Sequence, residues 1–186
     1  MLLAVAGVAD GAAAPAEARA VVRLCKCLPL SIAMAGRLVA DLSLGGDWAG
    51  ILDALQEEFE HGGQRSVEES VIAASLRGVG GRHREEVLAL FRAMALIPED
   101  VHAPLELLAM IYEAEAGAGA ARPSLLNLRR WLKALLDRCL VTGTVDRPSL
   151  HDIPRDFTIG QHSAAELRLA HHRLVEILRA RCPVFR

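Results

Sequence analysis

The two lysines of the chain are the first residues to test for nucleotide chemistry. A phosphate-binding loop needs glycines that bring backbone amides close to the phosphates, followed by a lysine and then a serine or threonine. Lys26 lies between two cysteines, and Lys133 lies between Leu132 and Ala134, so neither lysine has this setting. We therefore predict that the chain is not an enzyme by itself and is at most part of a larger ATPase.

Other residues with reactive or metal-binding side chains form no recognisable set. The glycine-rich residues 78–81 follow no strand and precede a helical pattern, so we interpret them as a turn between helices. His171 and His172 are adjacent in a predicted helix, where neighbours face apart. Cys25 and Cys27 lack the second cysteine pair of a structural zinc site, and we interpret them as buried thiols. We predict no catalytic set and no bound metal.

The composition is typical of a folded, mainly helical chain. Of its 186 residues, 52% are hydrophobic and only 4% are aromatic. Alanine and leucine are abundant and β-branched residues rarely run together, which favours helix over strand. The net charge of -2 and a pI near 6.4 give no overall reason to bind nucleic acid or an anionic membrane.

Three features of the sequence predict a cytoplasmic protein. No stretch approaches the roughly 20 apolar residues that span a bilayer. The apolar residues Met1–Ala9 lack a basic start and are followed by Asp10, so we predict no signal peptide. Four cysteines in a chain of this length are too few for a disulfide framework, which fits a reducing compartment.

Hydrophobic spacing predicts short helices with glycine or proline joints. Residues 1–81 are predicted to form a small four-helix bundle, and its clearest amphipathic helix begins at Trp48, after the cap residue Asp47. Two pairs have the spacing of a capping box and predict further helix starts: Ser66 with Glu69, and Ser163 with Glu166.

Residues 82–186 are predicted to form a second domain of winged-helix type. Three helical patterns precede the one convincing strand, Cys139–Val145, and Asp146–Pro148 is predicted to be the following turn. Ser149–Ile153 is then the returning strand of a short hairpin. The predicted fold class is mainly α, with this single β-hairpin.

The first domain contains segments that resemble motifs of NB-ARC proteins. Val22–Gly36 includes Cys27-Leu28-Pro29-Leu30 and is similar to the GLPL region, with Cys27 where the family usually has glycine. Trp48–Leu55 then falls where the family has a tryptophan-led helix.

The second domain resembles the same family at three later segments. Ser149–Phe157 contains Leu150-His151-Asp152 and resembles the MHD segment, with leucine for methionine and with Pro154 where an aliphatic residue is common. Ala93–Val101 resembles the segment ending in Phe-Pro-Glu-Asp, with Ile97 for phenylalanine. Leu132–Val141 is similar to the leucine-rich helix and strand before the MHD motif.

The resemblance implies a position within a larger signalling ATPase. Residues 1–81 would correspond to the helical bundle, and residues 82–186 to the winged-helix subdomain, of a STAND-class, NLR-type protein without its P-loop subdomain. The chain would be the regulatory portion of an ADP/ATP switch in signal transduction and defence. It would bind ADP or ATP only when a P-loop subdomain is supplied, and would hold no metal of its own.

In that family the GLPL proline packs against adenine and the MHD histidine contacts the β-phosphate of ADP. The resemblance therefore implies that Leu28, Pro29 and His151 are the nucleotide contacts. The implied partners are the upstream nucleotide-binding subdomain and a downstream repeat domain, with no membrane and no nucleic acid.

The same residues also have plain structural interpretations. Pro29 is a typical first residue of a helix, and His151 suits the end of a strand. For Asp152 we prefer the structural interpretation, in which it caps a helix beginning near Ile153 or Pro154.

Two other functions stay open from the sequence. Arg129, Arg130, Lys133 and Arg138 lie on or beside a candidate recognition helix, as in a winged-helix DNA-binding regulator, although the same pattern suits a solvated helix face. A helical protein-interaction module that uses no nucleotide is the other alternative.

Overall fold

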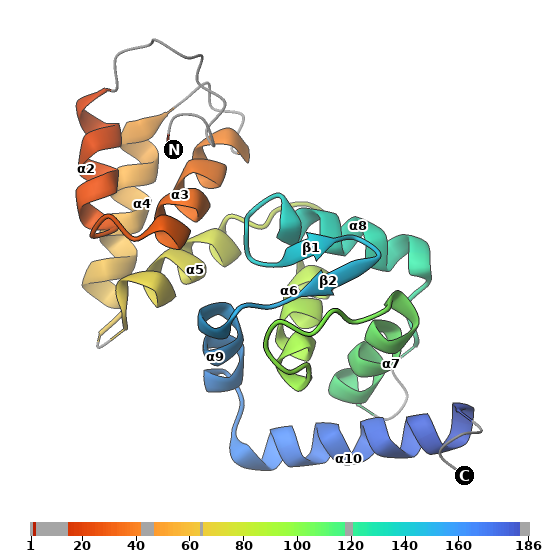
Figure 1. Ribbon diagram of the computed structural model, residues 1–186. Helices are drawn as coiled ribbons and strands as arrows, with labels where there is room; N and C mark the ends of the chain where they lie inside the picture. Colours follow the sequence, from red (N-terminus) through yellow and green to blue (C-terminus); the bar gives the residue numbers. More distant parts are fainter. Residues whose placement is uncertain (1, 3–14, 42–46, 64, 118–120, 183–186) are drawn as a thin grey trace. The chain divides into compact units, whose positions relative to one another are not determined.

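The computed structural model describes residue 2 and residues 15–41, 47–63, 65–117 and 121–182. The described residues are mainly α-helical, with one short two-stranded sheet, which confirms the predicted fold class (Figure 1). The chain forms two compact units. Unit 1 comprises Met1–Gly80 and Asp137–Leu140, and unit 2 comprises Gly81–Leu136 and Val141–Arg186. Apart from Leu2, the stretch Met1–Ala9 lies outside the described residues.

The described part of unit 1 consists of helices that pack through their apolar stripes. They are α2 (Ala16–Leu24), α3 (Pro29–Asp41), α4 (Trp48–His61) and α5 (Val67–Arg77). Helix α4 packs against α2, and α5 contacts both α3 and α4. Apolar residues recur at helical spacing, and burying one large side chain stabilises the fold by about 1.5–3 kcal/mol. The buried residues include Val21, Leu38, Ile51, Leu55, Val71 and Ile72.

The helix starts of unit 1 follow the predicted capping chemistry. The Asp47 carboxylate accepts a hydrogen bond from the backbone N–H of Gly50 at 3.0 Å, just ahead of α4. At the start of α5, the Ser66 hydroxyl accepts from the Glu69 N–H at 3.1 Å. The Glu69 carboxylate accepts from the Ser66 N–H at 2.7 Å. Both predicted caps are confirmed, and they satisfy amides that a helix start leaves free.

The described part of unit 2 has three α-helices and one short 3₁₀ helix, then the hairpin, then two more α-helices. Its elements are α6 (Arg84–Ala93), the short 3₁₀ helix η1 (Met94–Leu96), α7 (Leu105–Ala116), α8 (Leu125–Leu136), β1 (Thr142–Thr144), β2 (Arg147–Ser149), α9 (Asp152–Gly160) and α10 (Ala164–Arg181). Helix α6 packs against α7 and α8, while α10 packs against α7 (Figure 1). The core includes Leu90, Phe91, Leu108, Ile111, Leu128, Leu132 and Leu135. The predicted capping box at the start of α10 is confirmed.

The hairpin is shorter than predicted and its turn lies elsewhere. Cross-strand pairs join Thr142 to Ser149, Gly143 to Pro148 and Thr144 to Arg147, so the turn is Val145–Asp146. The predicted turn at Asp146–Pro148 is therefore wrong. Proline fits within β2 because each strand of a two-stranded sheet has one edge without a ladder partner, where no N–H is needed.

Both predicted strands also had wrong bounds. Cys139 has a left-handed backbone, with φ at 56°, so it cannot continue an extended strand, and β1 begins only at Thr142. The predicted returning strand Ser149–Ile153 keeps only its first residue in β2, because the helical residues of α9 begin at Asp152.

Candidate functional site

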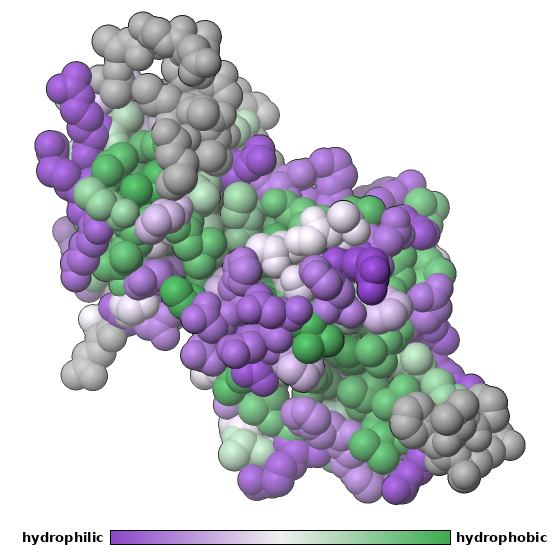
Figure 2. Space-filling model, in the orientation of Figure 1, coloured by the Kyte–Doolittle hydropathy of each residue, from purple (hydrophilic) through white to green (hydrophobic). Residues whose placement is uncertain are grey.

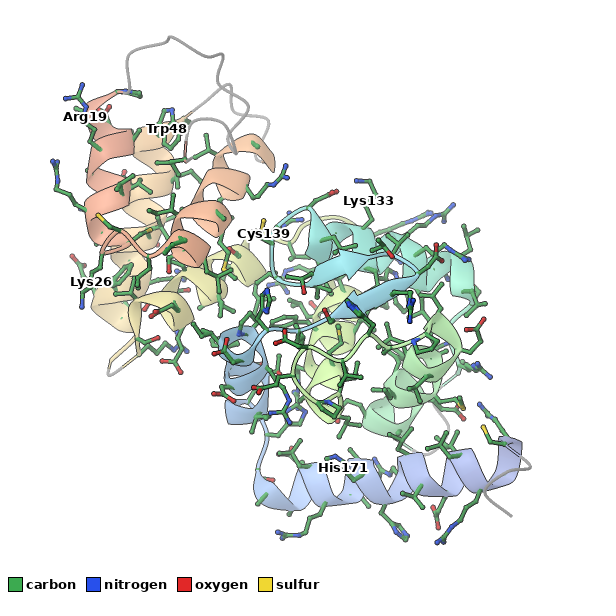
Figure 3. The ribbon with its side chains drawn as sticks, in the orientation of Figure 1. Arg19, Lys26, Trp48, Lys133, Cys139 and His171 are labelled. Atoms are coloured by element: carbon green, nitrogen blue, oxygen red, sulfur yellow. The ribbon has the colours of Figure 1, made fainter. Side chains whose placement is uncertain are left out.

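The turn before α3 positions the residues of the GLPL-like motif. Helix α2 ends in a Schellman motif, in which the Cys27 N–H donates to the Val22 carbonyl at 3.1 Å and the Lys26 N–H donates to the Arg23 carbonyl at 2.9 Å. Lys26 and Cys27 both have left-handed backbones, with φ at 48° and 58°. Figure 3 shows Lys26 in this turn between α2 and α3. Such a turn usually contains glycine, which this chain lacks here.

Pro29 is the first residue of α3, and its side chain is exposed. Its fixed φ and missing N–H suit this position, because the first amides of a helix have no partner within the helix. Leu28 precedes it and is half-buried, and its carbonyl accepts the Ile32 N–H at 3.0 Å. The structural interpretation of Pro29 as a helix-start residue agrees with this geometry.

The two cysteines of this turn differ in exposure. Cys25 is fully buried, and this burial, with a smaller effect of Cys27, raises the pKa of its thiol to about 11. A thiol with such a pKa stays protonated at neutral pH and is a poor nucleophile and metal ligand. Cys27 is exposed, so its prediction as a buried thiol is wrong. The left-handed turn carries it past the end of α2 and away from the core.

His151 lies at the N-cap of α9, and its imidazole turns to another segment. Its Nδ1 lies 2.9 Å from the Asp100 carboxylate, and the side chains of His151 and Asp100 are 50% and 69% exposed. An ionised carboxylate can only accept, so Nδ1–H is the donor. The Asp100 backbone N–H also donates to the Leu150 carbonyl at 2.9 Å. Two hydrogen bonds thus fix Asp100 against the Leu150-His151-Asp152 motif.

Asp152 does not cap α9 as predicted. The cap position belongs to His151, whose side chain makes no capping hydrogen bond, and Asp152 is the first helical residue. The Asp152 carboxylate accepts from the adjacent Ile153 N–H at 2.8 Å. The prediction was one residue off, although the carboxylate does satisfy a free amide of the first turn, where it also interacts favourably with the helix dipole.

The contact between Asp100 and His151 is one of several between the segments 97–103 and 147–155. The Arg155 Nε–H donates to the Ile97 carbonyl at 2.8 Å, and the Ala103 N–H donates to the Pro148 carbonyl at 3.0 Å. These bonds link residues about 50 positions apart in sequence. Asp100 and Arg155 were not predicted as site residues, since only the folded chain brings them beside the histidine motif.

The predicted contact residues therefore fall into two groups. Leu28 and Pro29 are neighbours in unit 1, at the start of α3. His151 belongs to unit 2, where it pairs with Asp100.

Two of the basic residues on or beside α8 make hydrogen bonds to other parts of the protein. Arg129 forms a bidentate hydrogen bond to the Asp146 carboxylate at 2.7 and 3.0 Å. Arg138 is buried in unit 1 and donates to the Gly78 carbonyl at 3.1 Å, so it cannot reach a phosphate backbone. Lys133 projects outward from α8 (Figure 3).

The remaining candidates lie on helix surfaces. His171 and His172 are exposed on α10, where Nδ1 of His171 donates to the Leu167 carbonyl at 2.8 Å. Within the described ranges, no three histidine, cysteine or acidic residues gather closely enough to hold a metal ion. No helix among these residues combines the length and apolar character needed to cross a membrane. No protein-family model matches the chain, and a search of curated proteins found no relative.

Proposed function

We propose that the chain is the regulatory portion of an NB-ARC-type ADP/ATP switch, in which Leu28 and Pro29 contact adenine and His151 contacts the β-phosphate of ADP. The observation that carries the proposal is the pairing of Asp100 with the Leu150-His151-Asp152 motif. Two segments that separately resemble this family, 93–101 and 149–157, meet at this pairing.

The chemistry of His151 suits a phosphate sensor. Its Nδ1–H donates to Asp100, which leaves Nε2 as the nitrogen available to a ligand. In the neutral ring that nitrogen is an acceptor, and only the imidazolium donates from both nitrogens. A phosphate on Nε2 and the Asp100 carboxylate on Nδ1 would each accept a hydrogen bond from the ring. His151 would then bridge two anionic groups, one from the protein and one from ADP.

The GLPL-like turn supports the proposal in a different way. The position of Cys27, where the family usually has glycine, has a left-handed φ of 58° that glycine adopts without strain. The resemblance in sequence thus coincides with a backbone conformation that explains it. The exposed ring of Pro29 next to this turn offers a rigid apolar surface, which suits the face of a purine.

The proposal includes the location and partners of the protein. ADP or ATP would bind between this chain and a P-loop subdomain, which supplies the phosphate loop and magnesium contacts. Exchange of ADP for ATP would shift the population away from the closed form, because only ADP would place its terminal phosphate at His151. The switch would act in cytoplasmic signalling, with a downstream repeat domain as its further partner.

The test joins the chain to an NB-ARC P-loop subdomain and measures release of a fluorescent ADP analogue. His151→Ala should speed release by about tenfold or more, since a hydrogen bond to a charged group contributes about 1.5–3 kcal/mol. His171→Ala, an exposed histidine on α10, is the matched control and should leave release unchanged. Equal release from the joined protein and its His151→Ala variant would refute the sensor role. A partner protein bound equally well with and without nucleotide would favour the interaction module instead.

A further inference from the structure

Unit 2 contains a cavity of about 360 Å³ between helices α6, α7 and α10. Apolar and charged side chains share its wall, and Figure 2 shows both kinds of surface over α7 and α10. This volume lies within the range of about 300–1,000 Å³ that small-molecule sites occupy. The lining residues are Ala89 and Arg92 from α6, Tyr112, Glu115 and Ala116 from α7, and Glu166, Leu169, Ala170 and Arg173 from α10.

The two acidic side chains of the cavity already have protein partners. The Glu115 carboxylate accepts from Nε2 of His162 at 2.8 Å and lies 3.4 Å from the Arg92 guanidinium. The Glu166 carboxylate accepts from the Ser163 N–H in the capping box, and this hydrogen bond lowers the pKa of Glu166. Both carboxylates therefore have hydrogen-bond partners within unit 2.

The basic side chains of the cavity are less well satisfied. Nε of Arg92 is buried and has no hydrogen-bond partner among the described residues. Arg173 forms no ion pair with a carboxylate in that part of the chain. Its guanidinium lies next to Gly117, where an added Cβ would come within 3.1 Å of Nη1. A glycine at the end of α7 thus leaves room for the Arg173 guanidinium at the cavity.

We propose that this cavity binds a small organic carboxylate with an apolar body. The carboxylate would accept hydrogen bonds from Arg173, whose planar donors match it in a bidentate geometry. The apolar body would lie against Leu169, Ala170 and the ring of Tyr112. Glu115 and Glu166 in the wall would repel a dianion such as a phosphate monoester more strongly than a monoanion, so the site favours a single negative charge. This site is independent of the proposed nucleotide contacts.

The test uses benzoate as the probe, benzamide as its neutral isostere and the full chain as the protein. Backbone amide NMR spectra would follow the lining residues Ala89, Ala116 and Leu169. We expect benzoate to shift these amides with a dissociation constant of about 1 mM, the range for a ligand of this size. Benzamide should bind at least about tenfold more weakly, because it lacks the charge that Arg173 recognises.

Two variants separate binding from folding. Arg173→Gln should weaken benzoate binding by about tenfold or more. Arg168 lies on the same helix but outside the cavity, so the control Arg168→Gln should leave benzoate binding unchanged. If Arg173→Gln does not fold, Ala116→Leu fills the exposed rim of the cavity instead and should also abolish the shifts.

Three results would overturn the proposal. The first is the lack of any shift of the lining amides at about 10 mM benzoate, and the second is equal binding of benzamide. The third is an Arg173→Gln variant that loses stability but binds benzoate normally. Arg173 would then serve only as a cation near the carbonyl end of α7, where the helix dipole favours a positive charge.

Discussion

Replacing Cys27 by glycine should stabilise unit 1, although glycine usually weakens a protein. Cys27 has φ at 58°, and a left-handed backbone costs a residue with a side chain about 1–2 kcal/mol. Glycine avoids that cost but gives the unfolded chain more freedom, which costs about 0.5–1 kcal/mol. The difference predicts a gain of about 0.5–1 kcal/mol for Cys27→Gly. The exposed thiol makes no buried contact whose loss would offset this gain.

The assay follows urea unfolding by the fluorescence of Trp48, which is buried in α4 of unit 1 (Figure 3). The chain has two tryptophans, so a Trp131→Phe background leaves Trp48 as the reporter of unit 1. The expected gain should raise the urea midpoint by roughly 0.3–0.7 M, at a slope of about 1.5 kcal/mol per M.

The control is Arg23→Gly, because Arg23 is exposed but helical in the last turn of α2. It should lower stability by about 1 kcal/mol, the usual cost of glycine in a helix. If Cys27→Gly lowered the midpoint as Arg23→Gly does, the turn would not be strained in solution. That result would also remove one support for the likeness of this turn to the glycine-containing motif.

Three further outcomes follow from other parts of the structure. Glu58 is buried and pairs with two arginines, so Glu58→Ala should destabilise unit 1 by about 1–3 kcal/mol in urea unfolding. Glu85 belongs to an exposed ion pair, so the control Glu85→Ala should change stability by less than about 0.5 kcal/mol. At pH 8, iodoacetamide should modify the exposed Cys27 rapidly and should leave Cys25 unmodified until the protein unfolds, as followed by mass spectrometry. The pKa of about 11 leaves only about one Cys25 thiol in a thousand ionised at this pH. The hydrogen bonds from Ser163 hold the pKa of Glu166 below its ordinary value of 4.5. The ionised Glu166 therefore stabilises the fold above pH 4.5, and this stabilisation is lost as the pH falls through the lowered pKa. Glu166→Gln should reduce the acid-induced loss of stability, measured by thermal unfolding between pH 6 and pH 3.

The features that the sequence predicted correctly depend on neighbours within one or two helical turns. The capping box of Ser66 and Glu69 needs two residues three positions apart, and the start of α3 needs only the fixed φ of Pro29. Hydrophobic spacing located the helices for the same reason, because each apolar stripe is a property of one segment. Local chemistry of this kind is present in the chain before it folds.

The errors arose where distant segments decide the structure. Pro148 was assigned to a turn because proline often occurs there, but its carbonyl accepts from Ala103 and its place in β2 is fixed by that segment. Asp152 was assigned as a cap because its side chain suits one, whereas the cap position is taken by His151. The pairing of His151 with Asp100 spans about 50 residues, and no pattern in either segment names its partner.

The position of His151 is itself an argument about function. A helix N-cap favours serine, threonine, aspartate or asparagine, and loss of such a cap costs about 1 kcal/mol. Here the cap residue is a histidine whose side chain leaves the helix amides and turns to Asp100. The pair is largely exposed, so it contributes little to stability. The chain therefore has a weaker cap here and an imidazole oriented by Asp100, which is the arrangement that the proposed ligand-sensing role of His151 would need.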